Sequence, residues 1–110
     1  MLEALELKRK RRMLMYRIID GKGTGKTSRL LLLAKEQNGV VVCADPVAMI
    51  NKAYSYGLTG IDYVSYYEFF TEVTRTARPY DARPIFIDEL DKYLLFISSN
   101  LTGYTLSNED

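Results

Sequence analysis

The chain has 110 residues, of which 47% are hydrophobic and 26% are charged, and its formal net charge is +1. This length is enough for one compact domain, and the hydrophobic share excludes a disordered chain. Apolar runs of only a few residues exclude a membrane-spanning helix, which needs about 20. A single cysteine excludes a disulfide framework, and histidine is absent. Because the first residues also lack the apolar core of a signal peptide, we expect a reduced, cytoplasmic protein with no membrane partner.

The charge is distributed unevenly along the chain. Residues 1–17 carry six basic and two acidic side chains, a net +4, whereas residues 18–110 carry a net −3. The basic run Lys8–Arg12 has no apolar position to bury, which is typical of a solvated segment. Such a run also neutralises nucleic-acid phosphates without reading sequence, so a nucleic-acid partner stays open. We therefore divide the chain into a basic extension, 1–12, and one domain, 13–110.

Strands and helices are predicted to alternate from the start of this domain. The mostly apolar stretch 13–19 predicts a buried strand that ends at a glycine-rich turn. Leucine and alanine favour a helix over 26–37, which Gly39 ends. The β-branched run 40–44 predicts a second strand, buried on both faces.

The alternation continues through the middle of the chain. Asp45 is the predicted N-cap of a helix over 46–56, with a proline in its first turn. A third strand is expected at 61–64. Ser65 and Glu68 have the spacing of a capping box for the next helix, which ends near residue 76.

The last third of the chain begins with a polar loop over 75–83. A fourth strand is predicted at 85–87, a helix at 90–98, and a fifth strand at 101–107. Strict alternation with short connections implies a parallel sheet that helices cover on both faces. We therefore expect an α/β fold, a three-layer α/β/α sandwich with a parallel five-stranded sheet.

A glycine-rich turn, Asp-Gly-Lys-Gly-Thr-Gly-Lys-Thr, joins the first strand to the first helix, and its end matches the Walker A pattern. Glycines let successive N–H groups point at phosphate, and the helix N-terminus adds partial positive charge. Lys26 is expected to reach the β- and γ-phosphates, and the Thr27 hydroxyl to bind Mg²⁺. The predicted nucleotide-binding residues are Gly21, Lys22, Gly23, Thr24, Gly25, Lys26, Thr27 and Ser28.

The turn departs from the pattern at its first position. Asp20 stands where the pattern has glycine, and a carboxylate near a polyphosphate opposes binding, although Gly21 supplies some of the missing conformational freedom. A dinucleotide-binding turn is the natural alternative, but it requires a third glycine at position 26, where the chain has Lys26. That alternative is rejected.

A second acidic motif follows the fourth predicted strand. Ile85–Ile87 delivers Asp88 and Glu89 at its carboxyl end, as a Walker B motif does. Asp88 is expected to contact the Mg²⁺ shell together with Thr27. Glu89 is expected to orient and deprotonate the attacking water, with Lys26 as the second catalytic residue.

The two motifs, Asp20–Thr27 and Ile85–Glu89, resemble those of P-loop nucleoside triphosphatases in the additional-strand, catalytic-glutamate division, which includes RecA-like motors, helicases and AAA+ proteins. The resemblance covers about residues 14–108. It implies ATP or another nucleoside triphosphate with Mg²⁺, the sheet order 5-1-4-3-2, and a polar sensor near the C-terminus; the sensor candidates are Thr105, Ser107 and Asn108. The compact layout is also similar to small ATPases encoded by bacteriophages.

The resulting expectation is Mg²⁺-dependent ATP binding with slow hydrolysis, since the sequence shows no helical lid or second motor domain. A protein partner, a second copy of the chain or nucleic acid would then stimulate turnover. The alternative is a regulatory module that binds nucleotide with little or no hydrolysis. A nucleoside or nucleotide kinase is disfavoured, because such kinases carry an arginine-bearing lid and acceptor-site acids, for which this chain has little room. An arginine finger would come from Arg75, Arg78, Arg83 or another subunit, and these three arginines are interpreted as solvated loop charges.

Two further features concern packing. Five of the nine tyrosines gather between residues 54 and 67. We expect most of them to pack helices on the sheet, with stacking on single-stranded bases as the alternative. Cys43 is predicted to be a small core residue.

Overall fold

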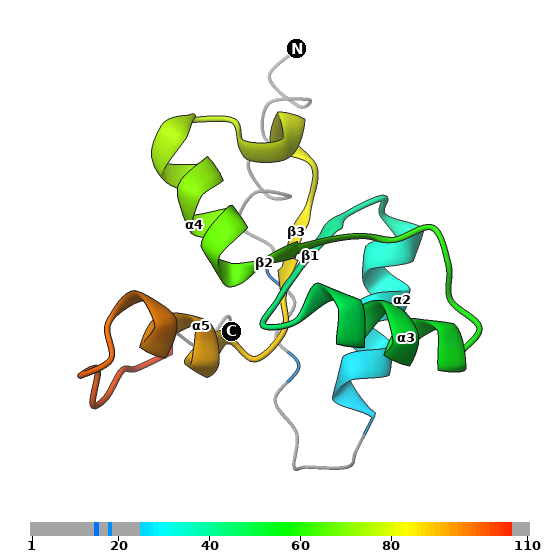
Figure 1. Ribbon diagram of the computed structural model, residues 1–110, viewed down its shortest axis with the longest axis horizontal. Coiled ribbons are helices and arrows are strands. Elements are labelled where there is room, and N and C mark those ends of the chain that lie inside the picture. Colours follow the sequence, from blue (N-terminus) through cyan, green and yellow to red (C-terminus); the bar gives the residue numbers. More distant parts are fainter. Residues whose placement is uncertain (1–14, 16–17, 19–24, 107–110) are drawn as a thin grey trace, which may run out of the picture.

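A computed structural model describes residues 15, 18 and 25–106. In this part of the chain, four α-helices and a short 3₁₀ helix surround three strands (Figure 1). The elements are α2 (Lys26–Glu36), β1 (Val40–Cys43), α3 (Pro46–Ser55), β2 (Asp62–Ser65), α4 (Tyr66–Arg75), η1 (Pro79–Ala82), β3 (Ile85–Ile87) and α5 (Leu90–Ile97). The predicted extension 1–12 lies outside the described residues, as does the predicted strand 13–19 apart from Met15 and Ile18.

The helices begin where the local sequence places their caps. The Asp45 carboxylate accepts a hydrogen bond from the Ala48 amide at 3.2 Å, and Pro46 occupies the first turn of α3. At the start of α4, Ser65 and Glu68 each accept a hydrogen bond from the other's amide, which completes the capping box. Both predicted N-caps are confirmed.

The three strands are parallel, in the order β2-β1-β3. The predicted five-stranded sheet with the order 5-1-4-3-2 is therefore wrong. That order placed the residues of β1 at an edge, whereas β1 pairs with β2 through Val41 and Tyr63 and with β3 through Val41 and Phe86. Burial gives the physical reason: all four β1 residues are buried, as a central strand requires, while β2 begins with exposed Asp62.

The fifth predicted strand is also wrong. Residues 101–106 form no regular structure, and Tyr104 and Leu106 are more than half exposed. Gly103 offers no side chain for a neighbouring strand or helix to pack against, which weakens a strand at this point. The sensor candidate Thr105 lies in this exposed segment, and Ser107 and Asn108 lie outside the described residues.

Two helices cover each face of the sheet. Side chains of β1 alternate between the faces, with Val41 and Cys43 toward α2 and α3 and Val42 toward α4 and α5. We call these the α2–α3 face and the α4–α5 face; Figure 1 separates them to the right and left of the strands. The buried α2–α3 cluster is Leu31, Ala34, Val41, Cys43, Met49, Ala53, Ile61 and Phe86. The α4–α5 cluster is Val42, Tyr66, Phe69 and Tyr93.

Candidate functional site

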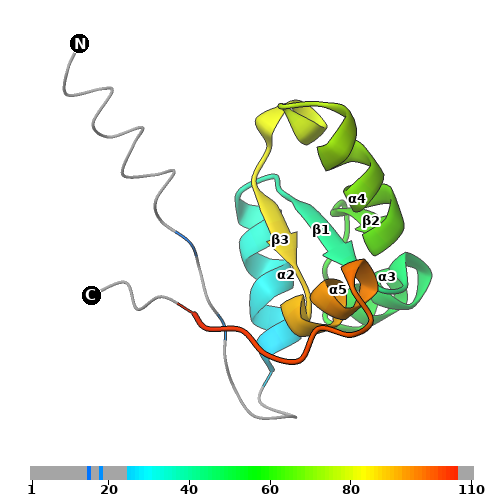
Figure 2. The same cartoon turned by 90° about the vertical axis from the view of Figure 1, so that its left-hand side faces the viewer.

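The carboxyl ends of β1 and β3 lie at the same end of the sheet as the amino end of α2. Figure 2 faces the α4–α5 side and shows α5 beginning where β3 ends. Gly25 is the N-cap residue of α2, with a φ of 78° that residues with a Cβ seldom adopt. The first turn of α2 contains no acidic side chain of its own.

Thr27 and Asp88, from the two motifs, approach each other at this end of the sheet. The Thr27 hydroxyl lies 3.5 Å from Asp88 Oδ1, the outer limit of a hydrogen bond, across 61 positions of sequence. The Asp88 amide donates to the Val42 carbonyl at 2.9 Å, so pairing with the central strand continues to this residue. Asp88 is therefore placed by the sheet and Thr27 by the first turn of α2.

The electrostatics at Asp88 combine burial with opposing charges. Burial raises the pKa of this half-buried carboxyl, and the neighbouring Glu89 raises it further. Lys52 of α3, the Thr27 hydroxyl and Lys26 act in the opposite direction and favour the ionised form. Among these three, Lys52 has the largest effect. Sequence reasoning missed Lys52, because its relation to Asp88 depends on the packing of α3 beside the central strand.

Glu89 has an unusual backbone and a paired side chain. Its φ of 56° and ψ of 68° are left-handed, a conformation that costs a residue with a Cβ about 1–3 kcal/mol. Its carboxylate forms an ion pair with Lys92, one turn into α5, at 2.9 Å. Glu89, the predicted general base, thus directly follows Asp88 in the sequence. Its carboxylate, however, pairs with Lys92 of α5.

Tyr66 was predicted only as one of a packing cluster, yet it contacts the acidic turn. Its hydroxyl donates to the Asp88 carbonyl at 2.8 Å and lies 3.3 Å from the Glu89 carbonyl. Tyr63 is also partly buried, whereas Tyr54, Tyr56 and Tyr67 are exposed. Two of the five tyrosines are therefore buried or partly buried, and the expectation that most of them pack is wrong.

Cys43 ends the central strand beside these groups. It is buried, which confirms the predicted core position. Burial, followed by the charges of Asp88 and Asp45, raises the pKa of its thiol to about 11. Cys43 is therefore a neutral core thiol at physiological pH, without the thiolate character of a nucleophile.

The rest of the predicted nucleotide-binding set lies at the start of α2 or outside the described residues, and the loop residue Arg83 lies apart from Asp88. Gly21–Thr24 lie outside the described residues, while Ser28 donates to the Gly25 carbonyl at 2.8 Å within the first turn of α2. Arg83 is anchored rather than solvated, because it donates to the Asn38 carbonyl and pairs with Asp62 at 2.8 Å. These contacts lie at the amino ends of the strands, away from Asp88.

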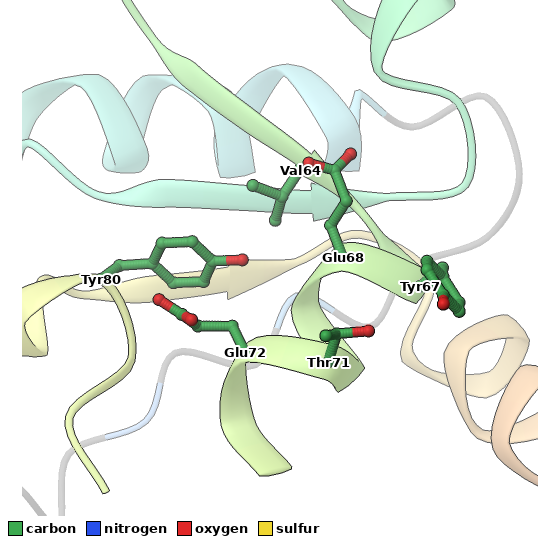
Figure 3. Close-up of a pocket in the computed structure, with 6 residues that line it drawn as sticks. All are labelled: Val64, Tyr67, Glu68, Thr71, Glu72 and Tyr80. Atoms are coloured by element: carbon green, nitrogen blue, oxygen red, sulfur yellow. The ribbon is translucent and has the colours of Figure 1, made fainter. Parts of the chain in front are cut away.

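A surface hollow of about 290 Å³ lies on the α4–α5 side. Its lining residues are Val64, Tyr67, Glu68, Thr71, Glu72 and Tyr80, and Figure 3 shows Glu68 and Glu72 on α4 with Tyr80 beside Glu72. Two carboxylates repel a polyphosphate, so this hollow is unsuited to the predicted nucleotide.

Two further properties concern ions and membranes. Within residues 25–106, no group of three or more Cys, Asp and Glu side chains is placed to hold a metal ion. None of the helices in this part of the chain is long and apolar enough to cross a membrane.

Comparisons with protein-family models, curated proteins and solved structures find no match to this chain. The functional interpretation therefore depends on the residues and their geometry.

Proposed function

We propose that the chain binds ATP with Mg²⁺ and hydrolyses it slowly, as a minimal P-loop ATPase. The observation that carries this proposal is the approach of Thr27 to Asp88 at 3.5 Å. The two motifs are 61 positions apart, and ATP hydrolysis requires them at the same place. The acid-free first turn of α2, which carries Lys26, supports phosphate binding at this end of the sheet.

The residues present fit the kind of magnesium site in which substrate phosphates supply some of the ligands. Mg²⁺ takes oxygen ligands and usually binds through one or two protein groups together with substrate phosphates and water. Thr27 and Asp88 supply two such oxygens. The ion would neutralise charge on the β- and γ-phosphates.

The proposed reaction is attack of water on the γ-phosphorus. The new P–O bond forms as the bond to the β–γ bridging oxygen breaks, and ADP leaves with that electron pair. Glu89 accepts the proton that the water loses. For this step its carboxylate must turn away from Lys92.

A second candidate function is nucleotide binding without appreciable hydrolysis. The Glu89–Lys92 ion pair favours it, because a carboxylate held at 2.9 Å from the Lys92 ammonium group is directed along α5. A chain of this kind would regulate a partner through its bound nucleotide.

The proposal includes stimulation by a partner in the cytoplasm. Lys8–Arg12 would contact nucleic-acid phosphates in a salt-dependent way. A second copy of this chain or another protein would supply an arginine to the γ-phosphate. In the described residues, Arg75 and Arg83 already pair with acids of their own chain.

The decisive experiment is a phosphate-release assay on the wild type and Glu89→Gln, each with and without single-stranded DNA. We expect Glu89→Gln to bind ATP with unchanged affinity and to lose roughly 100-fold or more in rate, since a positioned general base contributes about that much. Asp91→Asn is the matched control, because it neutralises an exposed acid in the first turn of the same helix and is expected to retain the wild-type rate.

Each outcome selects one candidate. Phosphate release that depends on Glu89 supports the ATPase. ATP binding without release above buffer, with or without DNA, selects the binding module. Unchanged release by Glu89→Gln contradicts the assignment of the base.

A further inference from the structure

Tyr66 packs on the α4–α5 face of the sheet and contacts the acidic turn formed by Asp88 and Glu89. It is the first residue of α4, follows the capping residue Ser65, and is only 7% exposed. Its hydroxyl donates to the Asp88 carbonyl at 2.8 Å, across 22 positions of sequence. Tyr93 and Phe96 of α5 seat the ring, with centroid separations of 5.4 and 6.2 Å. The Tyr66 ring is therefore positioned by aromatic contacts with α5.

The contacted turn needs external support. Glu89 is left-handed, with a φ of 56°, and such a residue persists only where its surroundings determine it. The Tyr66 hydroxyl reaches the carbonyl groups of the two peptide groups that flank the Glu89 Cα, those of Asp88 and Glu89, at 2.8 and 3.3 Å. Burial and the charges of Asp88 and Glu89 raise the pKa of Tyr66, so the hydroxyl keeps its proton and remains a donor.

We propose that Tyr66 is a positioning residue that holds the Asp88–Glu89 turn, and that it sets the rate of ATP hydrolysis rather than nucleotide affinity. This inference rests on the proposed function. Tyr66 acts through two main-chain carbonyls, so it influences where the Glu89 carboxylate can reach. Phosphate binding depends on α2, which packs on the other face of the sheet.

Tyr66→Phe is the test, because it keeps the ring and removes only the hydroxyl. We expect its Kd for ATP to stay within about twofold and its kcat to fall by about 3- to 10-fold, the effect of one lost hydrogen bond. Tyr93→Phe is the matched control: it removes the hydroxyl of a buried residue in the same cluster, and no hydrogen bond joins that hydroxyl to the turn among residues 25–106. Its kcat is expected to stay within about twofold of the wild type.

A second measurement does not depend on hydrolysis. The ¹³C shift of the Asp88 carbonyl should change in Tyr66→Phe and stay unchanged in Tyr93→Phe, because only the first substitution removes a donor to that oxygen.

The outcomes separate this inference from the proposed function. If the wild type hydrolyses ATP and Tyr66→Phe matches it, the positioning role fails and the ATPase stands. Equal losses of affinity and rate in both tyrosine variants indicate a purely structural role and also overturn the inference. If the wild type binds ATP but releases no phosphate, the ATPase fails together with the rate role of Tyr66, even where the carbonyl shift reports the hydrogen bond.

Discussion

The two faces of the sheet bury different kinds of side chain. On the α2–α3 face the packing is mostly aliphatic around one buried aromatic ring, that of Phe86, and Leu31, Ala34 and Val41 are at most 1% exposed. On the α4–α5 face it is aromatic, with Tyr66, Phe69 and Tyr93 in edge-to-face contact. Apolar side chains at the margins of both faces are exposed: Phe70 and Phe96 are about 40% exposed on the α4–α5 face, and Leu32 and Ile50 are nearly half exposed on the α2–α3 face.

This difference indicates a division of labour at the carboxyl end of β3. The Asp88 carboxylate faces Thr27 of α2, and the Asp88 carbonyl faces the Tyr66 hydroxyl of α4. The α2–α3 face therefore supplies the side chains suited to phosphate and metal, while the α4–α5 face supports the backbone that carries the acids. The following three substitutions probe the first of these two roles.

The largest effect is expected from Lys26→Ala. Removing one partner of a desolvated charge pair costs about 2–5 kcal/mol, so ATP affinity should fall by about 100-fold or more. Isothermal calorimetry measures this loss. The control is Lys35→Ala on the same helix, because the Lys35 ammonium donates to the Thr59 carbonyl and is remote from the first turn. If the wild type and Lys26→Ala bind ATP with equal affinity, the phosphate site does not lie on the α2–α3 face.

A comparable free-energy effect, on stability rather than on affinity, is expected from Leu31→Ala, which opens a cavity between α2 and the sheet. Leu31 is fully buried, and such truncations cost about 3 kcal/mol of unfolding free energy. Leu32→Ala is the matched control, because Leu32 is 47% exposed on the same helix and should lose less than about 1 kcal/mol. Urea unfolding measures both, and equal losses would contradict the packing described for α2.

The smallest effect is expected from Asp88→Asn, and it depends on pH. Because burial raises the pKa of Asp88 in the folded chain, the folded state binds the proton more strongly than the unfolded state does. The contribution of this proton to the free energy of unfolding is complete at pH values below the pKa of Asp88 in the unfolded chain, about 3.9. It is lost as the pH rises through the higher pKa of Asp88 in the folded chain. Asparagine is neutral throughout, so the variant should have a slightly higher Tm than the wild type at about pH 7.

This gain in Tm should shrink toward about pH 3, where the wild-type carboxyl is protonated as well. Thermal unfolding at the two pH values provides the measurement. Asp91→Asn, at an exposed acid in the first turn of α5, is the control and should show no gain. A wild type that is more stable than Asp88→Asn near neutral pH would show that the surrounding lysines outweigh burial.

Local sequence was sufficient to predict the four described α-helices and three strands, but the short 3₁₀ helix η1 lies in the predicted loop 75–83. Asp45 begins α3 and Ser65 begins α4, because capping acts between residues three positions apart. The runs that form β1 and β3 were recognisable because buried strands need continuous apolar residues. The candidate residues Thr27 and Asp88 were found in the same way, as members of short motifs.

Strand order was not predictable from the same local patterns. The sequence defines β1 and β2 as strands, but their neighbours are chosen by packing and by edge-to-edge hydrogen bonds between distant segments. The full burial of Val40–Cys43 and the exposure of Asp62 are consistent with central and edge positions, respectively. The contrast between the apolar run Val40–Cys43 and the charged Asp62 was the available indication of this strand order. The resemblance to P-loop nucleoside triphosphatases pointed instead to the order 5-1-4-3-2.

The sequence by itself therefore determined the elements, their caps and the two short motifs, because these depend on neighbours along the chain. Only the tertiary structure decided which groups surround Asp88. Lys52 and Tyr66 belong to no motif, and they act on the acidic turn because α3 and α4 pack on opposite faces of the sheet. Contacts across 22 to 61 positions form only when a shared core brings separate segments together.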